Sequence, residues 1–381
     1  MQINALQKEI NELIKAGKKV INLSAANSTF FESLLLTRKI QKAFPKVLSR
    51  PYYEANTKGY LTARQSIADF YQKIDITIDP ENILLTSGTS ESYLYLFRYF
   101  SQDGGEILFP RPSYPLFSEI AKLVNIELKY YNLNAQNSWK IDVEDLETKI
   151  TPKTRAIVLI SPNNPTGSML SKANLQDVLA LAKKHNIAII SDEVFSEFVY
   201  NNEEFPSPLY EADNQLIFSL NGLSKTYALP GLKLSWILMK GPQKELQPIA
   251  DQLELMIDAL LSCNQFSQVL LPTILKEGGK WLKNYHARIE KNRLLTIDIL
   301  SQCPNLEFHY PEGGFYIFPK VLNTKLTDEE FCLDLLKKTG LYVHPGYFYD
   351  FPENCHFLLC FLQDPKILKK SLKKIVKYLS S

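Results

Sequence analysis

Between about residues 80 and 240, short apolar runs alternate with segments whose apolar residues recur at helical spacing. The runs are rich in β-branched and aromatic residues, and most end at Gly, Pro, Ser, Asn or Asp: ENILLTSG, GEILFP, IELKYYNL, RAIVLISP, IAIISDE, QLIFSLN and LKLSWILMK. Strands that alternate with helices form a mostly parallel sheet whose two faces are covered by those helices. The pattern predicts a large α/β domain.

The pattern changes after this region. It is helical to about residue 300, with EKNRLLTIDIL as its clearest helix, and then gives the strand-like segments LEFHYPEGGFYIFPK, LYVHPG and CHFLLCFL around one further helix. A chain of 381 residues exceeds the usual limit of a single core. We expect an N-terminal segment (1–45) that joins a small α+β domain (271–381), and a large domain (46–270) between them.

The charge balance excludes one class of partner. Lysine and arginine total 43 and aspartate and glutamate total 41, so no global field attracts the chain to nucleic acid or to an acidic membrane. Only eight residues are arginine, and none lies beyond Arg293.

The cysteines and the N-terminus indicate the compartment. Five cysteines form no CxxC pair and lie mostly in apolar runs, as reduced core thiols do, so neither disulfides nor a metal site is expected. The first residues read as a charged amphipathic helix, and no apolar run reaches the length of about 18 residues that spans a membrane. These features predict a cytoplasmic protein.

In a parallel sheet, ligands bind at the carboxyl ends of the strands. One such end, LLTSGTSESYLYLF, turns into a helix at Ser87, Gly88, Thr89 and Ser90, which could form a phosphate cradle from free N–H groups and hydroxyls. Ordinary helix capping explains the same residues. The chain has neither GxGxxG nor GxxxxGK[ST], so no dinucleotide or NTP loop is indicated.

Other strand ends carry polar residues that a loop does not require. SPNNPTG places two asparagines after a buried strand, and IAIISDEVF sends Asp192 and Glu193 off another, where a carboxylate is costly without a cationic partner. Tyr114 follows a third strand on a proline-stiffened turn and could present its ring to a flat ligand.

Two lysines stand in the apolar stretch SLNGLSKTYALPGLKLSW, at Lys225 and Lys233. Lysine is normally kept in water. An amine held out of water has a lowered pKa, which favours its use as a nucleophile and base.

Taken in order, these motifs resemble the class I/II aminotransferases, which are fold type I enzymes that depend on pyridoxal 5'-phosphate (PLP). The resemblance covers nearly the whole chain, through NLSAANSTF, YYEANTKGYLTARQSIADFY, TSGTSESY, PSYPLF, PNNPTG, SDEVF, GLSKTYALPGLK, EGGFYIF and HPGYF. It implies a homodimer with shared active sites that transfers an amino group between an amino acid and a 2-oxo acid.

The resemblance also implies roles for the residues. Lys225 holds PLP as an internal aldimine and moves a proton once substrate displaces it. Asp192 keeps the pyridine nitrogen protonated, Tyr114 stacks on the ring, and Asn164 bonds the phenolic oxygen on the substrate side. The phosphate is held by Gly88, Thr89, Ser90 and Ser224, by Lys233 in place of the family's arginine, and by Tyr53, or the adjacent Tyr52, of the neighbouring subunit.

Two departures concern the cofactor and the substrate. Phe195 replaces a family tyrosine and removes one hydrogen bond to the cofactor oxygen. Leu358 stands where the family has the arginine that binds the substrate α-carboxylate. Arg38 is our preferred substitute, His356 is the second candidate, and binding through another group of the substrate is the third possibility.

Other functions stay open at this point. The missing arginine is compatible with another PLP chemistry on the same fold, such as a lyase, decarboxylase or cyclising reaction. A regulator built on the fold would need a DNA-binding module, and only about 40 residues precede the core, without a basic helix-turn-helix pattern. The presence of Lys225, Asp192 and Asn164 disfavours a non-catalytic binder.

Overall fold

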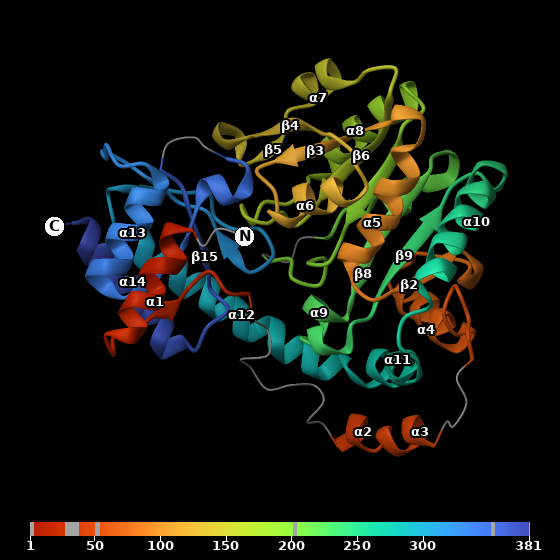
Figure 1. The fold of residues 1–381 in the computed structure, drawn as a ribbon, viewed down its shortest axis with the longest axis horizontal. Coiled ribbons are helices and arrows are strands. Elements are labelled where there is room, and N and C mark those ends of the chain that lie inside the picture. Colours follow the sequence, from red (N-terminus) through yellow and green to blue (C-terminus); the bar gives the residue numbers. More distant parts are fainter. Residues whose placement is uncertain (1–3, 27–37, 50–53, 201–203, 352–354, 381) are drawn as a thin grey trace.

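The computed structural model describes residues 4–26, 38–49, 54–200, 204–351 and 355–380. Figure 1 shows a larger part built around one sheet and a smaller part beside it, with the long helix α12 (Gly279–Leu300) running from one toward the other.

The larger part contains the predicted sheet, and its mostly parallel character is confirmed. The strand order is β2-β9-β8-β7-β6-β3-β4-β5. Adjacent pairs among β4, β3, β6, β7 and β8 are parallel, whereas β9 is antiparallel to both of its neighbours and β5 is antiparallel to β4. The strands are β2 (Ile83–Thr86), β3 (Glu106–Arg111), β4 (Leu128–Asn134), β5 (Lys140–Ile141), β6 (Thr154–Ile160), β7 (Ala188–Asp192), β8 (Ile217–Gly222) and β9 (Ser235–Lys240).

Helices cover both faces of this sheet, which explains why its strands are apolar throughout rather than alternating. Along β3, Leu108 packs into one core and Phe109 into the other. One face is covered by α5 (Thr89–Phe100), α6 (Leu116–Leu123) and α10 (Gln243–Leu260). The other is covered by α4 (Leu61–Gln72), α7 (Val143–Lys149), α8 (Lys172–Lys184) and α11 (Gln265–Glu277).

The smaller part has a three-stranded antiparallel sheet in the order β11-β15-β14 and a two-stranded pair, β10-β12. Helix α12 packs on α14, and α13 packs on α14 as well. The elements are β10 (Leu306–Glu307), β11 (Tyr316–Ile317), β12 (Lys320–Val321), α13 (Asp328–Thr339), β14 (His344–Pro345), β15 (Phe357–Cys360) and α14 (Pro365–Leu379). Short 3-10 turns connect elements at Pro80–Asn82, Gln102–Gly104, Ala135–Asn137, Pro208–Asn214, Pro230–Leu232 and Gly346–Tyr349.

The N-terminal elements divide between the two parts. Helix α1 (Ala5–Lys15) packs on α13, and β1 (Ile21–Asn22) pairs in parallel with β13 (Leu341–Tyr342). In contrast, α2 (Arg38–Gln41) and α3 (Phe44–Leu48) contact α11, at the lower edge of Figure 1.

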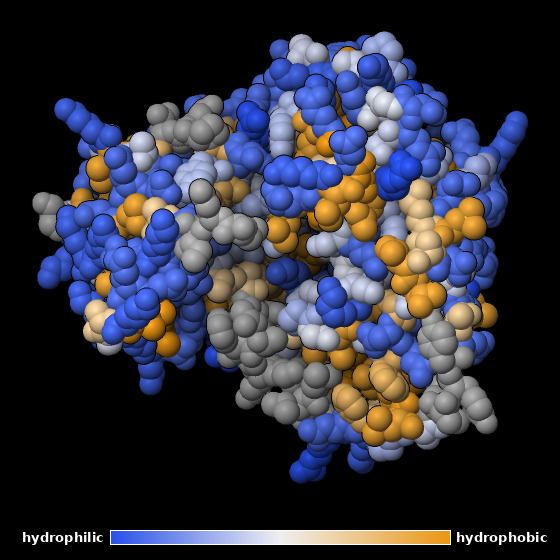
Figure 2. Space-filling view, in the orientation of Figure 1, coloured by the Kyte–Doolittle hydropathy of each residue, from blue (hydrophilic) through white to orange (hydrophobic). Residues whose placement is uncertain are grey.

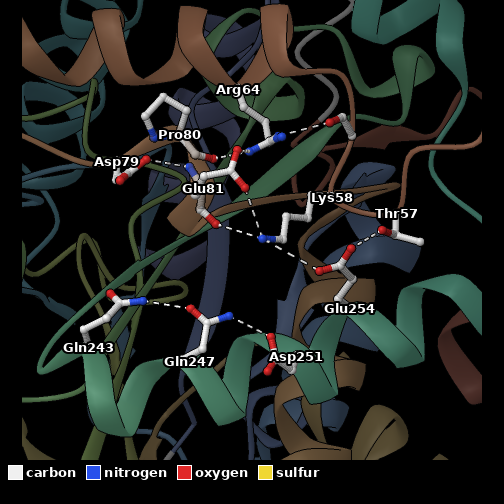
Figure 3. A network of polar contacts seen from close by, with 11 residues as sticks. Thr57, Lys58, Arg64, Asp79, Pro80, Glu81, Gln243, Gln247, Asp251 and Glu254 are labelled. Atoms are coloured by element: carbon white, nitrogen blue, oxygen red, sulfur yellow. Dashed lines mark hydrogen bonds and ion pairs between the residues drawn. The ribbon is translucent and has the colours of Figure 1, made fainter.

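An ion-pair network holds the segment before α4 against the edge of the sheet (Figure 3). The Lys58 ammonium lies 3.2 Å from the Glu81 carboxylate and 3.7 Å from that of Glu254 on α10. The buried Arg64 guanidinium lies 2.9 Å from Glu81, and its Nε donates to the carbonyl of Gly59. The network therefore ties the segment before α4, the turn before β2 and helix α10 together at one edge of the sheet.

Within the described ranges, no helix combines the length and the apolar character needed to cross a bilayer.

Candidate active site

The carboxyl ends of two neighbouring parallel strands bring Asp192 and Lys225 together. Strand β7 ends at Asp192, whose register partner on β8 is Leu220, and β8 leads directly into the single turn α9 (Leu223–Thr226) that carries Lys225. Burial lowers the pKa of the Lys225 amine, and the nearby Asp192 charge acts in the opposite direction. In the same orientation as Figure 1, Figure 2 shows the surface hollowed between the two parts, close to the position of α9.

Asp192 is buried, yet both of its oxygens accept hydrogen bonds. The Tyr93 hydroxyl donates to Oδ2 at 2.9 Å, and the Val194 N–H donates to Oδ1 at 3.2 Å. Burial raises the pKa of this carboxyl to about 6, whereas the bonds from Val194 and Tyr93 and the charge of Lys225 lower it. The sequence did not identify Tyr93, because an aromatic residue on the apolar face of a helix reads as core.

The predicted cradle lies at the start of α5. Gly88 is the residue before the helix, has φ 151°, and carries no side chain that could cap it. A Cβ at Gly88 would lie 3.3 Å from the Lys233 Nζ, so this exposed ammonium stands beside the first turn, which carries Thr89 and Ser90. A helix N-terminus with an adjacent cation suits an anionic group such as phosphate.

The two adjacent asparagines have different environments. Asn163 is engaged within the protein, because its Oδ1 accepts from the Thr166 hydroxyl at 2.9 Å and its Nδ2 donates to the Pro112 carbonyl at 3.4 Å. Asn164 is also buried, but its Oδ1 has no hydrogen-bond partner among the described residues. A buried polar atom without a partner costs about 1–3 kcal/mol. The Asn164 amide therefore has capacity for a ligand.

Two aromatic residues line the same region. The Lys225 Nζ lies 5.8 Å from the centroid of the buried Phe195 ring, and that ring packs on Phe315. The Tyr114 side chain is 39 % exposed and contacts Phe117 at a centroid distance of 5.8 Å, so one side of it can meet a ligand. Burial raises the pKa of Tyr114, which keeps it neutral.

These residues fit PLP. The amine of Lys225, with its lowered pKa, suits the aldehyde of PLP, and the buried Asp192 carboxyl group suits the pyridine nitrogen. The Asn164 amide, with Nδ2 as the donor, suits the phenolic oxygen, and the cation at the helix N-terminus suits the phosphate. Ser224 precedes Lys225 in α9 and is partly buried. Tyr53 and Tyr52 lie outside the described residues.

Strand β15 carries an apolar side chain at the position where the resemblance to the family implies an arginine. Leu358 is fully buried and pairs with His344 across the sheet. Cys360, two residues along, is close enough for the Lys225 charge to lower its pKa, although burial raises that pKa to about 12 overall. In the sequence, this cysteine reads only as part of the apolar run CHFLLCFL.

The two proposed substitutes for the arginine have different surroundings. His356 is buried among rings: Phe318 stacks on it at 5.1 Å, and Phe351 and Trp139 meet it edge-on at 5.0 and 6.0 Å between centroids. Arg38 begins α2 and is exposed.

A chain of contacts relates α2 to the residues after Lys225. Lys39 forms an ion pair with Glu277 at the end of α11. The next residue, Gly278, packs so closely on Tyr227 that a Cβ there would lie 2.4 Å from the Tyr227 ring. Helix α2, which begins at Arg38, is therefore in contact with the end of α11. That end in turn packs on Tyr227, two residues after Lys225.

Comparison with known proteins shows that the chain and its fold are similar to those of enzymes. The model of the family "Aminotransferase class I and II" matches residues 18–368. The glutamate-pyruvate aminotransferase AlaA of Escherichia coli K12 is 28 % identical over 98 % of this chain and 93 % of its own length. The mouse tyrosine aminotransferase is 29 % identical over 88 % of this chain and 76 % of its own length. The structure of an alanine aminotransferase from Pyrococcus furiosus superimposes with a TM-score of 0.93 at 27 % identity, covering 98 % of this chain and 96 % of that one.

Proposed function

The chain belongs to the class I and II aminotransferases, which depend on PLP, and on that premise we propose that Lys225 is the amine that carries the cofactor and moves the proton. The reaction transfers an amino group between an amino acid and a 2-oxo acid. The observation that carries the assignment is the placement of Lys225 and Asp192 at the ends of adjacent parallel strands, within electrostatic reach of each other. When bound, PLP supplies an electron sink for the carbanion formed at the substrate α-carbon.

Lys225 takes the proton from the α-carbon of the amino donor in one half of the reaction. In the other half it gives a proton to the α-carbon of the product amino acid. Its lowered pKa favours the neutral amine that this step requires. Asp192 would bond the pyridine nitrogen and keep a proton on it, because an ionised carboxylate stabilises the pyridinium.

The remaining residues orient the cofactor. The N–H groups and hydroxyls of Gly88, Thr89 and Ser90, together with Ser224 and the Lys233 ammonium, hold the phosphate. Tyr114 would cover one face of the ring, and the buried Asn164 amide would bond the phenolic oxygen on the substrate side. Phe195 contributes only its ring, so no hydroxyl from this position reaches that oxygen.

For the substrate α-carboxylate we retain Arg38 as the proposed partner. The ring enclosure of His356 disfavours it for binding an anion, whereas α2 adjoins, through α11, the segment that follows Lys225. Arg38→Ala should raise KM for an amino acid far more than KM for the corresponding decarboxylated amine. Equal effects on both substrates, or no effect, would remove Arg38 from the site.

The amino donor is tested directly by spectroscopy. The relatives are named for glutamate and pyruvate, for tyrosine and for alanine, so they favour amino transfer without selecting one donor. Single amino acids added to the holoenzyme should convert its absorption to that of pyridoxamine phosphate, and a 2-oxo acid should reverse the change. Release of carbon dioxide or ammonia without this conversion would instead indicate a lyase or a decarboxylase.

We also propose that the chain forms a homodimer. Large apolar side chains are 49 to 74 % exposed on α3, α4, α10 and α11 and the connection between the last two: Leu48, Leu61, Leu255, Leu260, Leu261 and Phe266. Figure 2 shows apolar surface gathered where Figure 1 places α4 and α11. A contiguous exposed apolar surface is typical of a protein interface. Light scattering should give twice the chain mass, and Leu260→Glu with Leu261→Glu should shift it toward the monomer.

A cytoplasmic location is proposed from the thiols. All five cysteines are free and buried in the structure, as is usual for a protein kept in a reducing compartment. Titration of the denatured protein under non-reducing conditions should find five thiols; fewer would indicate disulfides and a different compartment.

A further inference from the structure

A phenol hydroxyl is directed at the carboxylate of Asp192, the residue proposed above to bond the cofactor. The Tyr93 Oη lies 2.9 Å from Asp192 Oδ2, and the two side chains are only 1 and 6 % exposed. A buried hydroxyl needs a partner, but a backbone carbonyl would serve that purpose equally well. Here the partner is an acidic group at a strand end that faces the site.

The position of Tyr93 connects three parts of the site. It lies one turn after Thr89, so the helix whose first turn forms the phosphate cradle also supplies this hydroxyl. The Tyr93 ring packs on Phe117 at 4.6 Å between centroids, and Phe117 in turn contacts Tyr114 at 5.8 Å. Tyr93 is therefore part of the cradle helix, and its ring is linked through Phe117 to Tyr114, the residue proposed to cover the cofactor ring.

We propose that Tyr93 is a positioning residue that orients the Asp192 carboxylate toward the pyridine nitrogen of the cofactor and keeps it ionised. This inference rests on the role proposed above for Asp192. With Tyr93 on Oδ2 and the Val194 N–H on Oδ1, the carboxylate cannot rotate without breaking both bonds. Each oxygen keeps a second lone pair for the pyridinium N–H.

The hydroxyl opposes the cost of burial. Burial raises the pKa of Asp192 to about 6, and the Val194 N–H, the Tyr93 hydroxyl and the Lys225 charge each lower it. The neighbouring Glu193 is a further acidic group, and the charge of Asp192 raises its pKa. Loss of one charge-assisted hydrogen bond raises a carboxyl pKa by about one to two units. Without the hydroxyl, about half or more of the Asp192 carboxyl would be protonated at pH 7, and the protonated form cannot stabilise a pyridinium.

Tyr93→Phe tests this, because it removes the hydroxyl and keeps the ring. The matched control is Tyr131→Phe, since Tyr131 is also a buried tyrosine but donates to the carbonyl of Val158 at 2.6 Å. In the apoprotein, the Asp192 carboxyl pKa, measured by ¹³C NMR of labelled aspartate and assigned with Asp192→Asn, should rise by about one to two units in Tyr93→Phe and stay unchanged in Tyr131→Phe.

Cofactor binding gives a second readout. At pH 7 the dissociation constant of PLP should rise about tenfold in Tyr93→Phe, and the rise should shrink at pH 9, where Asp192 is ionised in either protein. In an Asp192→Asn background, Tyr93→Phe should add no further loss, because the two residues act as one unit. A purely structural role of Tyr93 would instead give an additive loss that does not depend on pH.

An unchanged Asp192 pKa in Tyr93→Phe overturns the inference. If that variant does not fold, 3-fluorotyrosine at position 93 provides the test: its more acidic phenol is the stronger donor, so the Asp192 pKa should fall, and no fall overturns the inference. The apoprotein pKa does not depend on where PLP attaches. Labelling of a lysine other than Lys225 would therefore defeat the proposed function without deciding the role of Tyr93.

Discussion

Asp192 and Glu193 are adjacent acidic residues at the end of one buried strand, and the protein treats them differently. Both are almost fully buried, and burial raises both carboxyl pKa values, to about 6 for Asp192 and about 7 for Glu193. Asp192 accepts from Tyr93 on α5 and lies near Lys225. Glu193 accepts from the Ser207 hydroxyl at 2.9 Å and borders a cavity of about 1040 Å³ that Tyr71 of α4 also lines.

The difference follows from the pleat of the strand, which sends successive side chains to opposite faces. One carboxylate faces α5 and the expected cofactor, and the other faces α4. Within the described part of the chain, none of the groups that shift the pKa of Glu193 is a cation, so it bears the cost of burial that the sequence predicted for an unpaired carboxylate. Residue type and burial alone therefore do not distinguish Asp192, the carboxyl group proposed to bond the cofactor, from Glu193; the neighbouring residues do.

The largest contrast should appear in activity. Asp192→Asn should lower kcat/KM by about 10²- to 10³-fold, as expected when a group that stabilises developing charge is removed. Glu193→Gln should change kcat/KM by no more than about threefold, because Glu193 lies on the face of the sheet toward α4. Its charge is too far from the reacting atoms to have a large effect. Steady-state kinetics with the amino acid that passes the spectral screen makes the measurement. Comparable losses in the two variants would break the distinction between the faces.

Both raised carboxyl pKa values should make stability depend on pH, and the part that comes from Glu193 extends to higher pH. The Glu193 pKa is about 7 in the folded protein, compared with 4.5 for a glutamate side chain in water, so ionisation opposes folding. This stability is fully present below about pH 4.5 and is lost as the pH rises through 7, by about 3 kcal/mol in total.

Glu193→Gln should remove the part of the pH dependence that comes from Glu193 and leave the part that comes from Asp192. Chemical denaturation of the apoproteins at pH 5, 6, 7 and 8 measures the free energy of unfolding, and the advantage of the variant over wild type should grow with pH. Parallel curves would show that Glu193 is not the group responsible.

Two lysines that flank β9 extend the comparison to the cofactor phosphate. Lys233→Ala should raise the dissociation constant of PLP by about ten- to a hundredfold, because a charge-assisted bond is worth about 1.5–3 kcal/mol. Lys233→Arg should retain or tighten binding, since a guanidinium can contact two oxygens. The matched control is Lys240→Ala, because that amine bonds the Leu209 carbonyl at the other end of the strand. Equal constants for wild type and Lys233→Ala would place Lys233 outside the phosphate site.

The smallest effect is expected at Phe195. A hydroxyl here would stabilise the deprotonated form of the bound chromophore, so Phe195→Tyr should lower the pKa of its absorption band by about one unit. Spectrophotometric titration of the holoenzymes measures it. An unchanged pKa would mean that another residue already supplies this hydrogen bond.

The sequence predicted the sheet and several strand-end residues because both depend on local patterns. Apolar runs define strands, and the polar residues that follow them must lie at one edge of a parallel sheet. Lys225, Asp192, Asn164 and Gly88 were found in this way, and the structure places all four at or just after strand ends. The chemical roles of these four residues stay predictions.

Tyr93 could not be found in this way. It is separated from Asp192 by 99 residues, and only the packing of α5 on the sheet brings its hydroxyl to the carboxylate. The environment of His356 was hidden for a similar reason. A strand pattern tells which residues share a face but not that Phe318, Phe351 and Trp139 cover this one. Likewise, apolar periodicity did not indicate that α2 and α3 pack on α11 while α1 packs on α13.

The central claim is that Lys225 carries the cofactor. Borohydride reduction of the holoenzyme fixes PLP covalently to its lysine, and mass spectrometry of the proteolytic peptides then locates the label. One labelled site is expected, Lys225, and the label should be absent from Lys225→Ala although that variant keeps its fold. Label on Lys233 or on any other lysine in the wild-type protein would contradict it.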